Sequence, residues 1–221
     1  MFDLDGVLVN SVACVEFAWR AWSEEQGFDA REIMKTAHGR RKSECLTLIS
    51  PLLDQEKEIR RLIELEDEKL NLVTPIPGAV EFLSSLPRNR WAIATSGERH
   101  GALLRLAKIG ITPPDILIAA EDVSQGKPQP EVYLKAAAGL NASVETCIVF
   151  EDAPPGIQAA TIAGMSVIGV ATTYSLAELF QASAIIRDFR PVAATVRSGE
   201  LSTLSIKELA SDPDIPGASA Q

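Results

Sequence analysis

Residues 2–8, Phe2-Asp3-Leu4-Asp5-Gly6-Val7-Leu8, read as a short strand that ends in two carboxylates and a glycine. Side chains alternate between the two faces of a strand, so Asp3 and Asp5 point the same way. Gly6 permits a tight turn directly after them. A calcium loop can also begin D-x-D-G, but it continues with oxygen-bearing side chains and a glutamate, whereas Val7 and Leu8 follow here. The stretch therefore predicts a strand that brings two acids to the edge of a sheet.

From about residue 78 onward, short apolar runs alternate with segments that read as helices. Turn residues or polar loops bound each run, and strands that alternate with helices indicate an α/β fold with a parallel sheet. Ligands of such open sheets gather at the carboxyl ends of the strands. The expected strands are Phe2–Leu4, Trp91–Ala94, Ile116–Ala119, Cys147–Phe150, Ser166–Val170 and Ala184–Ile186.

Residues 11–74 show a different pattern, because helix follows helix. The expected elements are helices at Val12–Gln26, Lys42–Ile49 and Gln55–Asn71, and a short turn around Ala30–Thr36. The last helix is rich in Glu, Lys and Arg, so we expect a solvated amphipathic helix without a binding role. The predicted units are an α/β core over 1–10 and 75–210, a helical cap over 11–74 and a disordered tail over 211–221.

Composition and charge limit the kind of partner. The formal net charge of −9 argues against nucleic acid as a general partner. No apolar stretch is long enough to span a membrane. Cys14, Cys45 and Cys147 are odd in number and far apart, which fits reduced core thiols better than a disulfide framework or a zinc site. We therefore expect a cytoplasmic protein, acting as a monomer, with neither nucleic acid nor membrane as partner.

Three further polar groups follow strands of the expected sheet. Thr95 and Ser96 end one strand, where hydroxyls either cap a turn or bind an anion. Lys127 lies between a glycine and a proline ahead of a helix, in a loop from which an ammonium could reach a phosphate. Glu151 and Asp152 end an apolar strand, where adjacent acids are costly without a cation, although Asp152 could also cap a helix. Magnesium prefers such oxygen ligands.

Taken in this order, the four groups resemble the motifs of the haloacid dehalogenase-like phosphohydrolases. The segments PGAVEFL, RWAIATSGER, EDVSQGKPQPEVYLKAAAGL and IVFEDAPPGIQAA are similar to the glycerol-phosphate and 2-deoxyglucose-phosphate phosphatase branch. The resemblance covers the chain from Phe2 to about Asp188. It implies a Rossmann-like core with helices on both faces, an inserted helical cap, and Mg²⁺-dependent hydrolysis of a small phosphorylated metabolite.

The resemblance also implies roles for individual residues. Asp3 would attack phosphorus and form an aspartyl phosphate, while Asp5 would act as general acid and then as general base. Asp3, the backbone carbonyl of Asp5 and Asp152 would hold Mg²⁺, with Glu151 among the metal ligands or just behind them. The phosphate oxygens would be bound by Thr95, Ser96 and Lys127.

One cap segment also resembles a pattern of this branch. Residues 38–41 have the sequence HGRR, which is similar to the HG-x-R pattern. His38 and Arg41 are therefore candidates for contact with the substrate or, for Arg41, for closure of the cap. Arg40 is the alternative to Arg41.

Three other functions are alternatives to this one. A phosphomutase of the β-phosphoglucomutase type would carry a histidine ten residues after the second aspartate, where this chain has Val15. A haloacid dehalogenase would need neither Asp5 nor the metal-binding pair. A non-catalytic binding protein of the same fold would be expected to lack a motif residue, and all are present.

The position of Asp3 departs from the family pattern. Asp3 is preceded by Met1 and Phe2, whereas family members have several apolar residues there. We expect a truncated or mis-assigned start, the alternative being a short central strand that pairs weakly.

Overall fold

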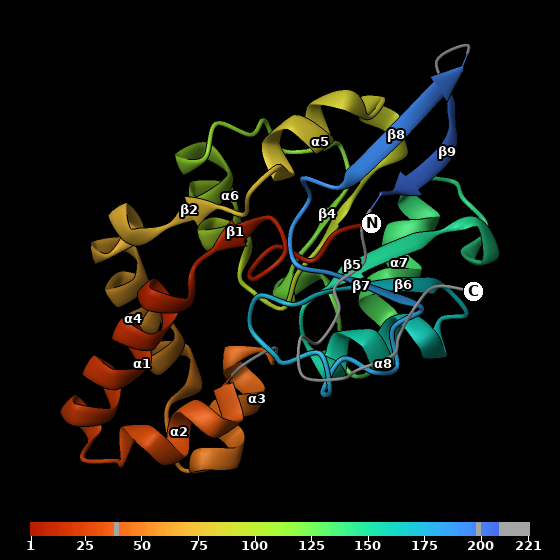
Figure 1. Cartoon of the computed structure of the whole chain (residues 1–221). Helices are drawn as coiled ribbons and strands as arrows, with labels where there is room; N and C mark the ends of the chain where they lie inside the picture. Colours follow the sequence, from red (N-terminus) through yellow and green to blue (C-terminus); the bar gives the residue numbers. More distant parts are fainter. Residues whose placement is uncertain (38–39, 198–199, 208–221) are drawn as a thin grey trace.

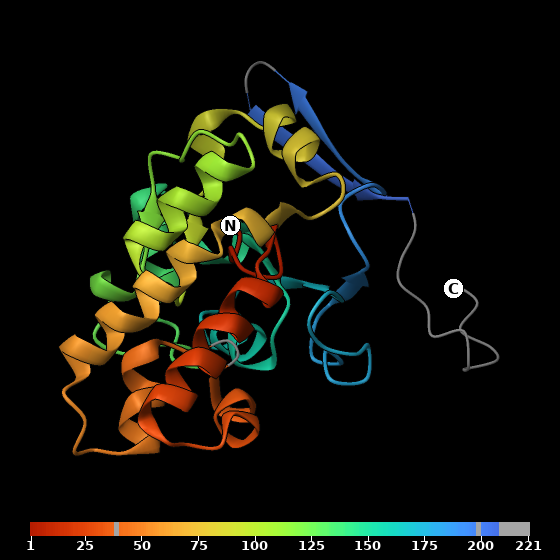
Figure 2. The ribbon, with the colours of Figure 1, turned by 90° about the vertical axis from the view of Figure 1, so that its left-hand side faces the viewer.

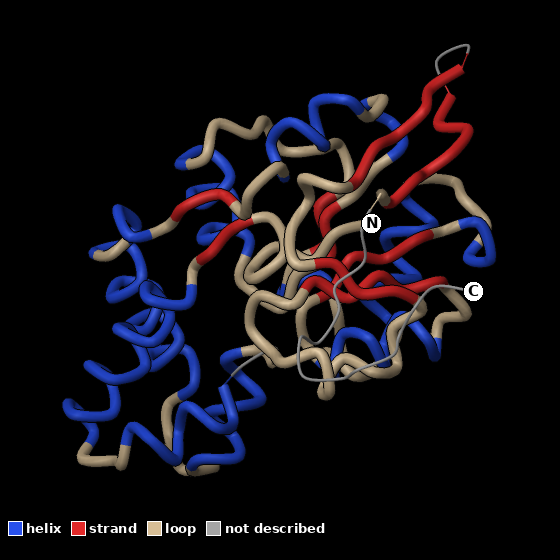
Figure 3. The backbone as a smooth tube through the Cα atoms, viewed as in Figure 1, coloured by secondary structure: helices blue, strands red, loops and turns tan. Residues whose placement is uncertain are grey.

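The computed structural model describes residues 1–37, 40–197 and 200–207. Its centre is a parallel sheet (Figures 1 and 3). In spatial order the sheet consists of β4 (Leu117–Ile118), β3 (Ile93–Ala94), the first residues of the chain, β5 (Ile148–Glu151), β6 (Ser166–Val170) and β7 (Ala184–Ile186). These strands agree with the predicted ones, some being shorter at their ends.

The start of the chain occupies the central strand position. Phe2 forms parallel bridges with both neighbouring strands, at Ile93 and Phe150. The backbone N–H of Asp3 donates to the carbonyl of Phe150 at 3.0 Å. Because Phe2 is held between β3 and β5, Asp3 emerges in the middle of the carboxyl edge of the sheet.

Helices cover both faces of this sheet, as predicted. They are α5 (Ala79–Ser85), α6 (Arg99–Lys108), α7 (Glu131–Gly139) and α8 (Pro154–Ile162). Phe2 and Phe150 belong to the core that includes side chains of α5 and α6, with their rings stacked 4.9 Å apart. Met1 and Val149, one position before each, belong to the core formed with α7 and α8. Successive side chains of a strand point to opposite faces of the sheet, and therefore these residues enter the cores on its two faces alternately.

The segment inserted after the first strand is helical and has its own core (Figures 2 and 3). It consists of α1 (Val12–Gln26), α2 (Ala30–Ala37), α3 (Lys42–Ile49), α4 (Gln55–Glu68) and the 3-10 helix η1 (Leu70–Leu72). Its buried side chains include Trp19, Trp22, Leu46 and Leu62. The two connections to the sheet, β1 (Val9–Asn10) and β2 (Thr74–Pro75), pair antiparallel. The boundaries predicted at residues 11 and 74 stay a prediction.

One local expectation in the cap is wrong, and a second holds only in part. The turn expected around Ala30–Thr36 is the helix α2, and the charged helix α4 is not simply solvated. Glu58 and Glu66 of α4 are 4% and 5% exposed, and Glu58 accepts a hydrogen bond from Trp22 at 2.7 Å. The number of Glu, Lys and Arg residues in a helix does not show which acids are solvated and which have a partner on another helix.

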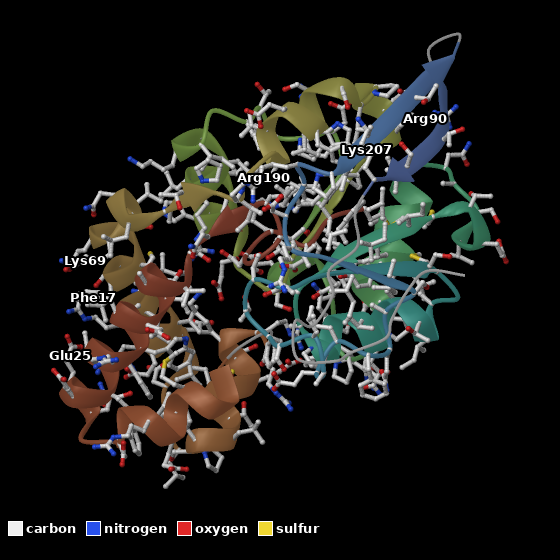
Figure 4. All side chains as sticks on the ribbon, viewed as in Figure 1. Phe17, Glu25, Lys69, Arg90, Arg190 and Lys207 are labelled. Atoms are coloured by element: carbon white, nitrogen blue, oxygen red, sulfur yellow. The ribbon has the colours of Figure 1, made fainter. Side chains whose placement is uncertain are left out.

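The outer side of the cap does carry solvated charge. Glu25 pairs with Arg61 of α4 at 2.6 Å, and both side chains are about one third exposed or more. Lys69 lies beside Phe17, with its ammonium 4.4 Å from the ring centroid (Figure 4). These residues mark the outward-facing surface of the cap.

The remaining elements lie outside the sheet and the cap. A hairpin of β8 (Val192–Arg197) and β9 (Glu200–Ile206), absent from the expected strands, projects beside α5 (Figure 1). Short 3-10 helices lie at Arg88–Arg90, Ala120–Asp122 and Val144–Thr146. The three cysteines are free and buried, as predicted. In the part of the chain that the structure describes, no helix is both long and apolar enough to cross a bilayer. The tail expected at 211–221 lies outside the described residues.

Candidate active site

Asp3 and Lys127 form the centre of the site. Asp3 is 7% exposed, at the carboxyl end of the central strand position. The ammonium of Lys127 donates to Asp3 Oδ1 at 2.5 Å, to Glu151 Oε1 at 2.6 Å and to the carbonyl of Ala94 at 3.2 Å. Three acceptors from three strand ends therefore fix one cation from the loop before α7.

Both oxygens of Glu151 are engaged by the protein. Oε1 accepts from Lys127 and from the hydroxyl of Tyr133 at 2.9 Å, and Oε2 accepts from the backbone N–H of Ala153 at 2.9 Å. A Cβ at Gly156 would lie 1.6 Å from Glu151 Oε1, so only glycine lets α8 begin this close to the carboxylate. Hydrogen bonds and the close approach of Gly156 therefore fix the position of the Glu151 carboxylate.

Asp152 directly follows the last residue of β5 and is 5% exposed. The side chain of Thr173 hydrogen-bonds its carboxyl group. A Cβ at Gly6 would lie 2.0 Å from Asp152 Oδ2, and Gly6 has a φ of +80°. Glycine at position 6 is therefore needed twice, for the left-handed turn after Asp5 and for the approach of Asp152.

Negative charge exceeds positive charge in this cluster. Burial raises the pKa of Asp3 to about 7, even though Lys127 opposes the shift. Burial, and then the charges of Glu151 and Asp3, raise the pKa of Asp152 well above its usual range. Burial alone would lower the pKa of Lys127, but the Asp3 and Glu151 carboxylates outweigh it and raise that pKa. Three carboxylates around one ammonium make a cluster that an added cation would stabilise.

The donor set fits a magnesium ion. Magnesium takes one or two protein carboxylates and completes its shell with water and substrate phosphate. Asp3 and Asp152 provide buried hard oxygens, and the close approach at Gly6 keeps their side of the cluster free of a Cβ. Within residues 1–37, 40–197 and 200–207, no group of three or more histidine, cysteine or acidic side chains is arranged to hold a metal by itself. This is compatible with an ion that needs only two carboxylates.

Asp5 lies at the rim, where two groups hold its carboxylate. The hydroxyl of Ser11 donates to Oδ1 at 2.6 Å, and Arg105 of α6 donates to Oδ2 at 3.1 Å. Thr95 is buried, and its Oγ1 accepts from the backbone N–H of Gly97 at 3.0 Å. That bond is the turn expected from the sequence, and a hydroxyl that accepts one bond still carries a donor hydrogen.

A cavity of about 100 Å³ connects these groups with the cap. Its core side is formed by the acids, hydroxyls and lysine described above, together with Thr173 and Tyr174. Its cap side is lined by Val12, Val15, Trp19, Arg40, Lys42 and Glu66. Residues from all four motifs therefore line one cavity between the sheet edge and the cap.

This arrangement has known counterparts. Residues 1–170 match the family model of haloacid dehalogenase-like hydrolases. The chain belongs to this family. It is 36% identical over 188 residues to glycerol-1-phosphate phosphohydrolase 2 of Saccharomyces cerevisiae, with 80% of this chain and 75% of the relative covered. It is 33% identical to 2-deoxyglucose-6-phosphate phosphatase 2 of the same yeast, with 83% and 84% covered.

A solved structure shows the same fold. The crystal structure of a hydrolase from Pseudomonas syringae matches with a TM-score of 0.78 and 27% identity, over 85% of this chain and 92% of that one. The two yeast relatives are phosphatases by name. The predicted family, branch and fold are thus confirmed.

The cap arginines of this haloacid dehalogenase-like chain occupy different places. Arg41 donates to the carbonyls of Val123 and Ser124, at 2.8 and 3.0 Å, in the loop that leads to Lys127. It also pairs with Glu44 at 2.7 Å. Arg41 thus lies at a contact between cap and core, as a role in closure would require, and Arg40 lines the cavity. His38 lies outside the described residues.

Several residues of the site were not found from the sequence. Ser11, Lys42, Glu66 and Arg105 line the cavity without belonging to a motif. Arg105 did carry a signal, because it lies on the buried side of α6 between Ala102 and Leu106. A charged side chain on the buried face of a helix is costly unless an oppositely charged group pairs with it, but the sequence does not identify that partner.

Proposed function

We propose that this chain is a magnesium-dependent phosphatase that hydrolyses a small sugar or polyol phosphate through an aspartyl-phosphate intermediate. The observation that carries the proposal is the buried Lys127–Asp3 pair at 2.5 Å, flanked by Glu151 and Asp152 at the carboxyl edge of the sheet. The names of the two yeast relatives support a glycerol-phosphate or 2-deoxyhexose-phosphate type of substrate.

In the first step Asp3 attacks phosphorus in line with the ester oxygen. The new bond joins Asp3 to phosphorus, the bond to the ester oxygen breaks, and Asp5 donates a proton to the departing alkoxide. Lys127 neutralises charge on Asp3 and on the phosphoryl oxygens, while Thr95 and Ser96 hold non-transferring oxygens. In the second step Asp5 takes a proton from water, which attacks phosphorus and releases Asp3.

Asp3, Asp152 and the backbone carbonyl of Asp5 would hold Mg²⁺. When bound, the ion offsets the repulsion between the anionic nucleophile and the phosphate. Glu151 is assigned a place behind these ligands, because Lys127, Tyr133 and Ala153 already engage both of its oxygens. Its work is to hold Lys127 in position.

The cap over residues 11–74 closes the site and selects the substrate. Arg40, on the cap side of the cavity, is the cap cation placed to meet a polar substrate group, and Arg41 docks the cap onto the Lys127 loop. The pairing of β1 with β2 supports hinge boundaries near residues 11 and 74. Three free, buried cysteines support a cytoplasmic location.

A phosphomutase is the nearest alternative. Val15, at the position where mutases of this family carry a histidine, lines the cavity and offers no titratable group. Hydrolysis is therefore favoured over transfer to a second hydroxyl.

Purified protein incubated with a panel of phosphate esters tests the proposal. We expect phosphate release from glycerol phosphate or a 2-deoxyhexose phosphate in the presence of Mg²⁺, and loss of that release in EDTA. Isomerisation of glucose 1-phosphate without phosphate release would favour the mutase. Absence of both activities across the panel would overturn the assignment.

A further inference from the structure

A buried chain of ion pairs joins the cap to the core, and the mechanism above does not use it. Arg105, in α6 of the core, donates to Glu66 of α4 at 2.7 Å and to Asp5 at 3.1 Å. Its side chain is 4% exposed. Burial alone would lower the pKa of Arg105, but the carboxylates of Asp5 and Glu66 raise it, so the guanidinium is held as a cation.

A cap lysine in turn holds Glu66, the cap partner of Arg105. Lys42 of α3 contacts Glu66 at 3.0 Å and Glu98, just before α6, at 2.6 Å. We call Lys42, Glu66, Glu98 and Arg105 the seam network. Lys42 is 7% and Glu66 5% exposed, so the network that crosses the boundary between cap and core is largely buried.

Arg105 of the seam network and Ser11 together hold the carboxyl group of Asp5. Ser11 holds Oδ1 at 2.6 Å and Arg105 holds Oδ2 at 3.1 Å, so the carboxyl plane is held at both oxygens. A guanidinium can only donate, so Oδ2 stays an acceptor. Ser11 donates to Oδ1, but a hydroxyl can rotate and accept instead, so Oδ1 is the oxygen that can carry a proton.

Stability alone does not account for the seam network. Buried ion pairs lose so much hydration that apolar residues of similar size often serve as well or better. Three of the four members, Lys42, Glu66 and Arg105, also line the cavity. Charge is therefore retained at the cap boundary where it faces the substrate space and the acid–base residue.

We propose that Arg105 is a positioning residue for Asp5, and that Glu66 and Lys42 hold Arg105 in place when the cap is docked. This role rests on the proposed phosphatase function. In the first step the proton on Asp5 Oδ1 passes to the ester oxygen as its bond to phosphorus breaks and the bond from Asp3 forms. Loss of Arg105 lets the carboxyl group rotate away from that oxygen.

The test uses two leaving groups that differ in their need for an acid. An alkyl phosphate must have its alkoxide protonated, whereas the p-nitrophenolate of p-nitrophenyl phosphate leaves unprotonated. Alcohol and p-nitrophenol release are measured in single turnovers with Mg²⁺, so that only the first step counts. In Arg105→Met we expect alcohol release to fall about 10- to 100-fold, out of the 10²–10⁴-fold typical of general acid catalysis, with p-nitrophenol release within about threefold.

Two further variants keep the test decisive. Arg105→Lys retains the charge but cannot fork between two carboxylates, so we expect the same selective loss. Glu66→Gln keeps the shape and an acceptor, and should show a weaker form of that loss. If Arg105→Met does not fold by circular dichroism, these two variants carry the comparison.

His100 and Asp67 provide a matched control at the same boundary. Their side chains meet at 2.8 Å between α6 and α4, and both are more than one third exposed. His100→Asn should change both release rates by less than about twofold, as expected for an exposed pair.

Three results would count against the inference. Equal losses for both esters in the Arg105 variants would make the seam network structural and overturn the positioning role alone. The same selective loss in His100→Asn would assign it to cap docking in general. Failure of the unmodified protein to release phosphate from either ester would instead overturn the phosphatase assignment, and the positioning role with it.

Discussion

Two charged regions of this molecule lie side by side and differ in balance. The floor cluster, Asp3, Lys127, Glu151 and Asp152, contains three acids and one base on the core. The seam network, Lys42, Glu66, Glu98 and Arg105, contains two acids and two bases, shared between cap and core. In the floor cluster, burial raises the pKa of Asp3 and of Asp152.

The difference separates two uses of buried charge. An unbalanced cluster has affinity for an added cation or for a proton, which suits a place where a metal ion and a phosphate meet. In a balanced network every charge has a partner of opposite sign, and such a network is suited to holding its side chains in fixed positions. We therefore expect changes in the floor cluster to abolish phosphoryl transfer itself. Changes in the seam network should instead disturb the orientation of Asp5.

The largest effect is expected from Asp3→Asn in the floor cluster. Removing the nucleophile should lower turnover on the order of 10⁴-fold or more, as in other enzymes with covalent intermediates. The fold should persist, because asparagine has the same shape and Lys127 keeps Glu151 as a partner. Steady-state phosphate release and circular dichroism check this, and full activity would refute the assignment of Asp3.

A matched pair of lysine variants compares the two regions directly. Lys127→Met removes the cation that contacts Asp3 and should cost about 10²–10³-fold in kcat, the typical value of a well-placed electrostatic donor. Lys42→Met leaves Glu66 bonded to Arg105, so its loss should be smaller. Equal losses in kcat would mean that the two regions do not differ in function.

Gly→Ala variants at two positions with similar backbone conformation distinguish the effect of backbone strain from the effect of a steric contact. Gly6 and Gly27 have φ values of +80° and +76°, but only the Gly6 Cβ would meet a carboxylate, Asp152. Gly27→Ala should lose about 1–2 kcal/mol, the strain of the left-handed conformation alone. Gly6→Ala should lose more and also weaken Mg²⁺-dependent stabilisation, as measured by chemical denaturation. Equal losses would contradict the close approach of Asp152.

Asp3 is also expected to make folding without metal depend on pH. Its pKa is about 7 in the fold and 3.8 in the reference state, so the folded protein binds the extra proton in this window. Stability contributed by protonated Asp3 is present at low pH and is lost as the pH rises toward 7. The stability of Asp3→Asn minus that of the unmodified protein, in EDTA, should therefore increase by about 3 kcal/mol between about pH 5 and pH 8.

Magnesium provides the control for this pH experiment. An ion bound beside Asp3 favours the ionised carboxylate, so adding Mg²⁺ should stabilise the unmodified protein at pH 8 and reduce the difference from Asp3→Asn. Urea titrations at each pH measure these differences. A difference between the two proteins that does not vary with pH would contradict the raised pKa of Asp3.

Much of the fold follows from local sequence pattern. The helices Val12–Gln26 and Lys42–Ile49 and the strands Ser166–Val170 and Ala184–Ile186 have the predicted bounds. Helical and strand periodicities involve neighbouring residues only, so a window of sequence contains them. The hairpin of β8 and β9 was not predicted, although runs rich in Val, Thr and Ile on either side of a Ser-Gly pair are typical of a hairpin.

The sequence by itself determined the members of the floor cluster, because each follows a strand of a parallel sheet and such strands end at one edge. It did not determine the seam network. Arg105 meets Glu66 39 residues away and Asp5 100 residues away, and Arg41 rather than Arg40 reaches the Lys127 loop. Those contacts depend on how the cap docks on the core, and only the tertiary structure decides which buried charges become neighbours.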